Sequence, residues 1–199
     1  MNPYNQAIFL KSAAKVSQLP DDTGFEVAFA GRSNAGKSSA LNCLTGIKQL
    51  ARVSKTPGRT QLINLFTVKD ADHRLVDLPG YGYAKVPHAV KEAWQKNLAH
   101  YLDVRQSLQG LILLMDIRHP LKELDETMVN WAYLRELPVH ILLTKSDKLS
   151  FSQVQSTVLM VRNHYKTLSH LLSVQAFSSL KKQGLETLIA QLNEWMQWG

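Results

Sequence analysis

The sequence contains one cysteine and no long apolar run. Cys43 therefore has no partner for a disulfide within the chain, which fits a reducing compartment. The longest uninterrupted apolar run, Leu111–Met115, is too short to cross a bilayer. The start of the chain has neither the basic residues nor the apolar centre of a signal peptide. We therefore expect a cytoplasmic protein that does not enter a membrane.

Acidic residues are absent from one long stretch. No Asp or Glu occurs between Val27 and Lys69, whereas basic residues are frequent there: Arg32, Lys37, Lys48, Arg52, Lys55, Arg59 and Lys69. Part of this charge suits bound phosphate groups, which acidic neighbours would repel. The basic residues from Lys48 onward fall in a polar connection, where a second polyanion such as RNA is a natural partner. A solvated basic loop without a partner is the alternative.

Strand-like and helix-like segments alternate along the 199 residues, of which 45% are hydrophobic. The expected strands are Phe25–Ala30, Leu62–Val68, Arg74–Leu78, Leu111–Asp116, Val139–Leu143 and Leu172–Phe177. The expected helices are Lys37–Gly46, His88–Arg105, Leu121–Leu134, Ser150–Leu168 and Leu185–Trp195. Continuous apolar strands indicate a mostly parallel sheet buried on both faces. The sequence thus predicts a single α/β domain over residues 1–199, with six strands, helices on both faces and a short N-terminal extension over about residues 1–22.

The most informative motif is a phosphate-binding loop. Residues 31–38 read Gly31-Arg32-Ser33-Asn34-Ala35-Gly36-Lys37-Ser38, and they fit the pattern GxxxxGK[ST] between an expected strand and an expected helix. Backbone N–H groups of such a loop point at phosphate oxygens, next to the positive end of a helix. Lys37 supplies a charge near the β- and γ-phosphates, and the Ser38 hydroxyl can bind magnesium. We include Ser39 in the expected nucleotide site.

A second motif, Asp77-Leu78-Pro79-Gly80, ends the expected strand at 74–78. An Asp at this place can hold magnesium through a water molecule, and a Gly amide can face the γ-phosphate. The pattern DxxG is a weak signal alone, but it gains weight after a phosphate loop. Because ligands bind at the carboxyl ends of parallel strands, we expect this motif beside the phosphate loop.

Two further segments predict recognition of a guanine base. Thr144-Lys145-Ser146-Asp147 follows the strand at 139–143. The Asp147 carboxylate can accept hydrogen bonds from guanine N1–H and the exocyclic amine together, while the Lys145 stem lies over the base. Adenine cannot make this paired contact, so the wrong base would leave a buried acceptor unpaired. Phe177-Ser178-Ser179 follows the last strand, where a backbone amide can meet guanine O6.

Together these motifs resemble the translation-factor-like P-loop GTPases over the whole chain. Within that class the sequence is similar to the EngB family of bacterial ribosome-biogenesis GTPases. The residues that carry the resemblance are the phosphate loop, Thr56-Pro-Gly-Arg-Thr-Gln61, Asp77-Leu-Pro-Gly-Tyr-Gly-Tyr-Ala84, Asp116-Ile-Arg-His-Pro120 and Thr144-Lys-Ser-Asp147. The resemblance implies one antiparallel strand, Leu62–Val68, and binding of GTP and GDP with magnesium. It also implies association with the large ribosomal subunit during assembly and a role in normal division and septation. We expect the protein to be a monomer.

The resemblance also implies a switch loop. Nucleotide contacts are expected from Gly58, Arg59, Thr60, Gln61 and Leu62. Thr60 is the expected second magnesium ligand besides Ser38, with Thr56 as the alternative. Residues 47–60 would then become ordered with GTP and loosen with GDP. The expected catalytic residues are Lys37, Thr60 and Gly80.

Hydrolysis is expected to differ from that of small signalling GTPases. They place a water-orienting Gln directly after DxxG, where this chain has Tyr81, so the intrinsic turnover should be slow. Asn34 can coordinate potassium between the phosphates, or it can form a loop-stabilising hydrogen bond. A second hypothesis is that ribosomal RNA or a ribosomal protein completes the site. Tyr81 and Tyr83, which flank Gly82, are expected on a second switch segment, where they can stack on RNA or pack beneath the switch.

Two other functional classes fit the phosphate loop less well. The motifs that contain Asp147 and Gly80 argue against a nucleotide kinase, and no Arg-rich lid is evident in the sequence. An RNA-binding module with a vestigial nucleotide site conflicts with the presence of Lys37, Ser38 and Asp77 together. The sequence therefore favours a GTPase switch.

Overall fold

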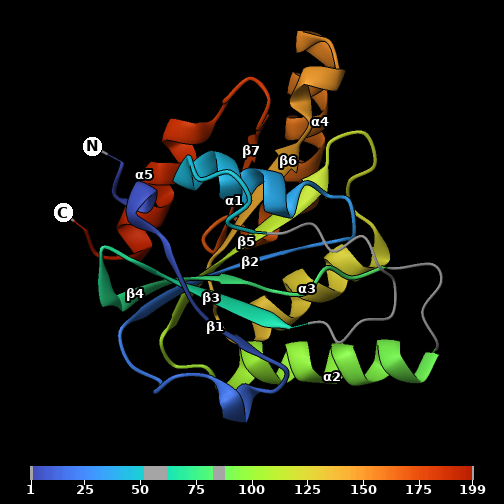
Figure 1. Ribbon diagram of the computed structural model, residues 1–199. Coiled ribbons are helices and arrows are strands. Elements are labelled where there is room, and N and C mark those ends of the chain that lie inside the picture. The colour runs from blue at the N-terminus through green and yellow to red at the C-terminus, as the bar shows by residue number, and fades with distance from the viewer. Residues whose placement is uncertain (1, 52–61, 83–87, 199) are drawn as a thin grey trace.

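The computed structural model describes residues 2–51, 62–82 and 88–198, which form a sheet with helices on both faces (Figure 1). The strands in this part of the chain are β1 (Ile8–Ala13), β2 (Phe25–Gly31), β3 (Ile63–Val68), β4 (Asp70–Asp77), β5 (Leu108–Asp116), β6 (Val139–Thr144) and β7 (Leu172–Ala176). The α-helices are α1 (Lys37–Thr45), α2 (His88–Val104), α3 (Glu123–Leu134), α4 (Phe151–His164) and α5 (Leu185–Trp195). Short 3-10 helices are η1 (Pro3–Gln6), η2 (Val16–Gln18), η3 (Ser146–Lys148) and η4 (Lys166–Leu168).

The strand order in the described sheet is β1-β3-β4-β2-β5-β6-β7. Strand β3 runs antiparallel to both of its neighbours, β1 and β4. The pairs β4–β2, β2–β5, β5–β6 and β6–β7 are parallel. The α/β fold with one antiparallel strand is therefore confirmed, and β3 begins one residue later than the expected range of 62–68.

The expected number of six strands is wrong, because the described sheet has seven. The strand that was not predicted is β1, which lies in the segment that we expected to be an N-terminal extension. Its residues 8–12 are exposed, and its register on β3 shifts between Phe9 and Lys11. β1 is thus an edge strand held mainly by backbone pairing, and its side chains carry little of the periodic burial that identifies a strand in sequence.

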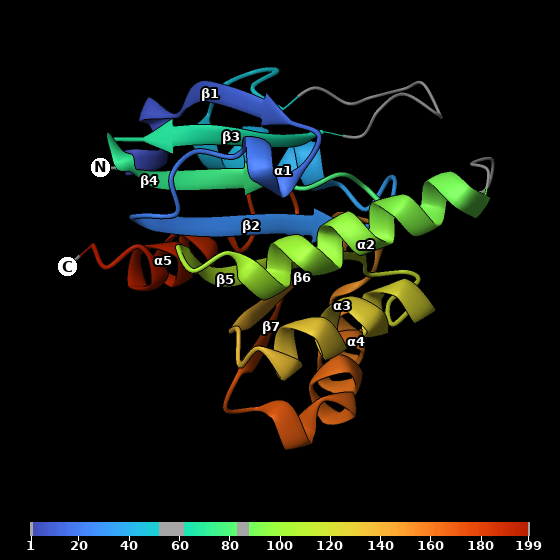
Figure 2. The ribbon, with the colours of Figure 1, turned by 90° about the horizontal axis from the view of Figure 1, so that it is seen from below.

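Two apolar cores form, one on each face of the sheet. Alternate residues of β5 supply both: Leu111 and Leu113 face α2, α3 and α4, whereas Ile112 and Leu114 face α1 and α5. Figure 2, seen from below, shows α2 and α3 in front of the strands, with α1 and α5 behind. Within the described residues, no helix is both long and apolar enough to cross a membrane.

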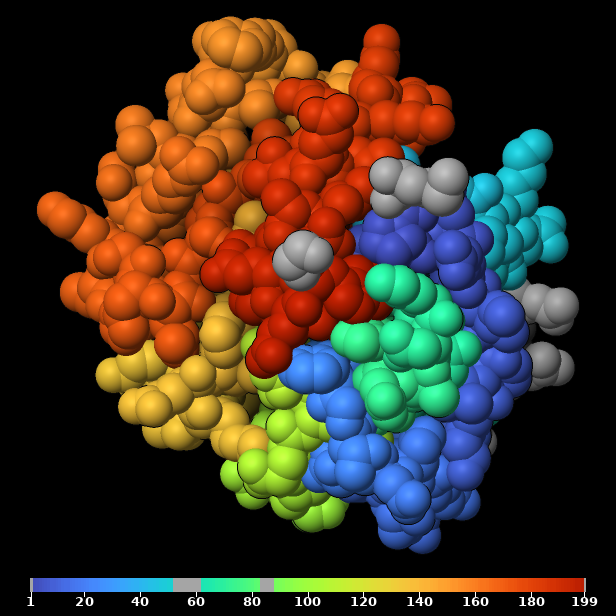
Figure 3. All heavy atoms as spheres, turned by 90° about the vertical axis from the view of Figure 1, so that its left-hand side faces the viewer, coloured from blue at the N-terminus to red at the C-terminus, as the bar shows by residue number. Residues whose placement is uncertain are grey.

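The two ends of the described chain meet on one side of the molecule (Figure 3). The Tyr4 hydroxyl donates to the Asn193 side chain at 3.0 Å, and the Tyr4 ring lies 5.4 Å from the Trp198 ring. His73 on β4 lies 4.8 Å from the Trp198 ring and contacts the Met196 carbonyl at 3.1 Å. These contacts anchor η1 and β4 to α5 and to the residues that follow it.

Candidate functional site

The phosphate loop connects β2 to α1, as its motif predicts. Gly31 ends β2 where a Cβ atom would stand 2.9 Å from the Leu114 carbonyl oxygen, so a side chain there would force β5 away. Gly36 has φ 92°, a left-handed conformation that favours glycine, and it caps the N-terminus of α1. Lys37 and Ser38 form the first turn of that helix. The positive end of α1 therefore opens directly onto the loop.

The expected guanine-reading segment touches the phosphate loop. The Thr144 hydroxyl donates to the Ala35 carbonyl at 2.5 Å, and the Lys145 ammonium donates to the Asn34 carbonyl at 2.7 Å. These contacts join residues more than a hundred positions apart in the chain. The Asn34 side chain is exposed, and within the described residues it makes no hydrogen bond.

The DxxG motif also lies against the phosphate loop. Lys37 and Asp77 form an ion pair in which Nζ contacts Oδ1, and the Asp77 carboxylate is nearly buried at the end of β4. The Leu78 amide donates to the Phe29 carbonyl at 3.0 Å, which continues the pairing between β4 and β2. Leu78 and Pro79 are buried, whereas Gly80 is half-buried. The motif therefore brings a carboxylate and a glycine to the edge of the loop.

The side chain after DxxG points into the protein. Tyr81 is 1% exposed, and its hydroxyl donates to Asp125 Oδ1 at 2.7 Å. Its ring lies 5.6 Å from the ring of Trp94 on α2. Of the two roles that the sequence left open, RNA stacking is therefore wrong for Tyr81, and packing is right. Sequence reasoning missed Asp125, because an Asp in the first turn of α3 looks like an ordinary helix-capping residue.

The carboxylate of Asp147, which the sequence predicts to read the base, is held by the segment after β7. The Ser178 hydroxyl donates to Asp147 Oδ1 at 2.6 Å, and this bond lowers the pKa of Asp147 below its ordinary value. Ser178 is fully buried, and its backbone pairs with Gln183 in both directions at 3.1 Å. Asp147 is thus an oriented, ionised acceptor.

The remaining residues of that segment differ in exposure. The Phe177 ring is buried in the core with α1 and α5, so only the backbone of Phe177 borders the site. Its carbonyl accepts from the Ser146 amide at 3.1 Å. Ser179 is half-buried.

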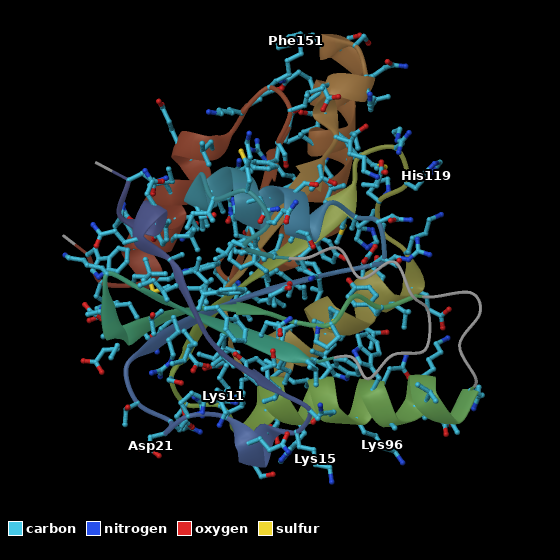
Figure 4. All side chains as sticks on the ribbon, in the orientation of Figure 1. Lys11, Lys15, Asp21, Lys96, His119 and Phe151 are labelled. Atoms are coloured by element: carbon cyan, nitrogen blue, oxygen red, sulfur yellow. The ribbon has the colours of Figure 1, made fainter. Side chains whose placement is uncertain are left out.

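An ion-pair cluster at the end of β5 supports Lys145. Asp116 accepts two hydrogen bonds from the Arg118 guanidinium, at 3.0 and 2.7 Å, and its Oδ2 lies 3.0 Å from Lys145 Nζ. These cations hold the pKa of Asp116 well below its ordinary value, with Arg118 contributing most. His119 points to solvent at the same turn (Figure 4). The cluster therefore shapes the turn that follows β5.

The expected switch-loop contacts Gly58, Arg59, Thr60 and Gln61, and the alternative Thr56, lie outside the described residues, as does Tyr83. Leu62 is described and stands exposed just before β3. The described site residues come together at the carboxyl ends of β2, β4, β6 and β7.

Known proteins are similar to this chain in sequence. A family described as 50S ribosome-binding GTPase matches residues 26–145. The chain is 58% identical over 192 residues to a probable GTP-binding protein EngB of Enterobacter sp. strain 638, covering 96% of this chain and 92% of the relative. It is 59% identical over 193 residues to the protein of the same description from Pseudoalteromonas translucida, covering 96% and 86%.

Solved structures of low sequence identity share the fold. A crystal structure of a probable GTP-binding protein engB superposes with a TM-score of 0.70 at 23% identity, covering 86% of this chain and 98% of that one. A variant of Aquifex aeolicus Era bound to GDP and AlF4⁻ superposes with a TM-score of 0.66 at 20% identity, covering 89% and 58%.

Proposed function

Because the chain belongs to the EngB family of GTP-binding GTPases, we propose that it is a nucleotide-dependent switch that acts in assembly of the large ribosomal subunit. We further propose that this role makes it necessary for normal division and septation. The ribosomal part is supported by the description of the matching family, and the switch part by the arrangement of the site.

One observation carries the nucleotide part of the proposal. The Lys145 ammonium and the Thr144 hydroxyl contact the phosphate loop, so a base reader and a phosphate cradle form one continuous site. We propose that residues 31–39, 77–80, 144–147 and 177–179, together with 58–62, contact the nucleotide. In this arrangement Asp147 reads the guanine edge and the backbone of the phosphate loop binds the β-phosphate.

Lys37 has a defined role in this proposal. Its ammonium contacts the nearly buried Asp77 carboxylate, and a cation at this depth is stabilised by anionic partners. Phosphate oxygens of GTP are such partners, and Lys37 would stabilise the charge that develops on them during hydrolysis. Gly80 would present its backbone amide to the γ-phosphate.

Magnesium fits the oxygen donors at this edge. Ser38 offers a hydroxyl in the first turn of α1, and Asp77 offers a carboxylate at the end of β4, both of which suit a hard cation. We propose that Ser38 and Thr60 bind magnesium directly and that Asp77 binds it through water. When bound, the ion neutralises charge on the β- and γ-phosphates.

Slow intrinsic hydrolysis follows from the position of Tyr81. Its hydroxyl is committed to Asp125, so it cannot orient an attacking water. We propose that potassium held by Asn34, or a ribosomal component, supplies the missing stabilisation. Equal turnover in potassium and sodium would remove the first option, and an unchanged rate on adding ribosomal particles would remove the second.

Isothermal titration calorimetry tests the nucleotide assignment. We expect the protein to bind GDP and to bind ADP at least about a hundredfold more weakly, because adenine leaves Asp147 without a paired donor. Equal affinities for the two nucleotides would refute the guanine assignment, whatever the ribosome does.

Co-sedimentation with large ribosomal subunits tests the partner. We expect stronger association with a non-hydrolysable GTP analogue than with GDP, and weaker association as salt increases. The Lys37→Ala variant is the control, because it should lose the difference between the two nucleotides. Association that is absent in both nucleotide states would contradict the ribosomal role but leave the GTPase assignment intact.

A further inference from the structure

Tyr81 is joined to the phosphate loop by its backbone. Its carbonyl accepts from the Ser33 amide at 2.7 Å, and its amide donates to the Gly31 carbonyl at 3.3 Å. Arg32 and Tyr81 form a parallel β-bridge between these two contacts. The residue that directly follows Gly80 therefore has a fixed position relative to the phosphate cradle.

The side chain of Tyr81 is joined to α3. Its hydroxyl donates to Asp125 Oδ1 at 2.7 Å, while Asp125 Oδ2 accepts from the Lys122 amide at 3.1 Å. Asp125 is 1% exposed, and burial raises its pKa above the ordinary value. An acid this well buried depends on its two donors, so loss of the Tyr81 hydroxyl would leave an acceptor unsatisfied.

A third contact comes from α2, the helix that follows the second switch in the chain. The Trp94 ring packs against the Tyr81 ring, with the two ring centroids 5.6 Å apart. Tyr81 is thus held by the phosphate loop, α2 and α3 together. Because the peptide unit is planar, fixing the Tyr81 amide also fixes the carbonyl and Cα atom of Gly80, and the Gly80 amide nitrogen is bonded to that Cα atom.

We propose that Tyr81 is a positioning residue for the Gly80 amide, and that its hydrogen bond to Asp125 sets the preference of the site for GTP over GDP. The inference rests on the proposed contact between Gly80 and the γ-phosphate. GDP has no γ-phosphate, so a displaced Gly80 weakens binding of GTP and leaves binding of GDP unchanged. A residue that only stabilised the fold would affect both nucleotides alike.

The test compares Tyr81→Phe with Tyr165→Phe. Tyr165 is the matched control, because it is also a buried tyrosine, and its hydroxyl donates to Glu126, the neighbour of Asp125 on α3, at 3.1 Å. Affinities for GDP and for a non-hydrolysable GTP analogue are measured by calorimetry with magnesium present, beside thermal unfolding of each variant. We expect Tyr81→Phe to weaken binding of the analogue about tenfold and to change binding of GDP less than about twofold.

Tyr165→Phe should lower thermal stability by a similar amount and leave the ratio of the two affinities unchanged. If Tyr81→Phe is too unstable to study, Asp125→Asn should shift the ratio in the same direction, since one acceptor oxygen is lost. The inference would be overturned if the ratio of the affinities for the GTP analogue and for GDP were unchanged in Tyr81→Phe, or in Asp125→Asn where that variant is used. In that case, binding of GDP would still support the proposed GTPase site. Failure of the wild-type protein to bind either guanine nucleotide would overturn both.

Discussion

Hydrogen-bond partners decide which charge state a single residue carries. His140 on β6 is nearly buried; the Ser173 hydroxyl contacts its Nδ1 at 2.6 Å, and its Nε2 contacts the side-chain oxygen Oε1 of Gln175 at 2.8 Å. The neutral ring satisfies both contacts, with Nδ1 accepting and Nε2 donating. Burial lowers the pKa of His140 below its ordinary value. The folded protein therefore favours the neutral ring, with its one proton on Nε2.

This arrangement predicts a loss of stability in mild acid. The unfolded chain binds a proton at a pKa of about 6.5, whereas the folded chain binds it only at lower pH, so the free energy of unfolding falls as pH drops below about 6.5. Urea unfolding between pH 7 and pH 5 should show a smaller decline for His140→Gln than for the wild type. His100→Gln, on the exposed face of α2, is the control and should keep the wild-type decline.

Asp147 is the second residue whose partner fixes its charge. Because Ser178 orients the ionised carboxylate, Asp147→Asn should exchange an acceptor for a donor at the proposed guanine contact. We expect GDP affinity to fall about a hundredfold and affinity for xanthosine diphosphate to exceed it, as measured by calorimetry. Asp70→Asn, which changes an exposed carboxylate at the start of β4, should leave both affinities unchanged. An undiminished affinity of Asp147→Asn for GDP would contradict the base-reading role.

At the scale of elements, α5 packs closely on the sheet because Gly110 of β5 has no side chain where Trp195 lies. A Cβ atom on Gly110 of β5 would stand 2.4 Å from Cε3 of Trp195. Gly110→Ala should therefore lower the free energy of unfolding by about 1–3 kcal/mol, because the ring has to move from its place on the strand. In a Trp195→Leu background the same change should cost much less. Equal costs in both backgrounds would show that the indole ring is not responsible.

At the scale of the whole molecule, a buried ionic cluster joins distant segments at the end of β2 opposite the phosphate loop. The fully buried Glu26 carboxylate accepts from Arg74 at 2.9 Å and from Arg105 at 2.7 and 3.0 Å. Arg105 also donates to the Pro20 carbonyl at 2.8 Å. The cluster thus ties the segment before β2 to β4 and to the end of α2.

Removing the anion should destabilise the fold without altering the site. Glu26→Gln leaves the buried Arg74 guanidinium without its carboxylate partner and leaves Arg105 with only Asp22, at 3.5 Å, so urea unfolding should show a loss of about 3–5 kcal/mol. GDP affinity of the folded variant should stay near that of the wild type, because the cluster is at the far end of β2. Asp21→Asn changes an exposed carboxylate of the neighbouring loop and should cost almost nothing (Figure 4). A loss of GDP affinity in Glu26→Gln would contradict this separation.

Local patterns were enough to predict most of the fold. The strand before the phosphate loop, the helix after it and five further strands follow from apolar periodicity and from glycine at the turns. The motifs at the strand ends were placed beside one another because parallel strands share a carboxyl edge. Edge strand β1 could not be predicted in this way, since its exposed side chains carry no burial pattern and its identity comes from pairing with β3.

The sequence by itself determined which chemical groups reach the site, because each motif places them by short-range geometry within a few residues of a strand end. Only the tertiary structure decided where the side chains between those motifs point. Tyr81 could face solvent or the interior, and it turns inward because Asp125, forty-four positions away, offers a buried acceptor. Such a contact depends on how α3 packs against the sheet, which no local pattern around Tyr81 encodes.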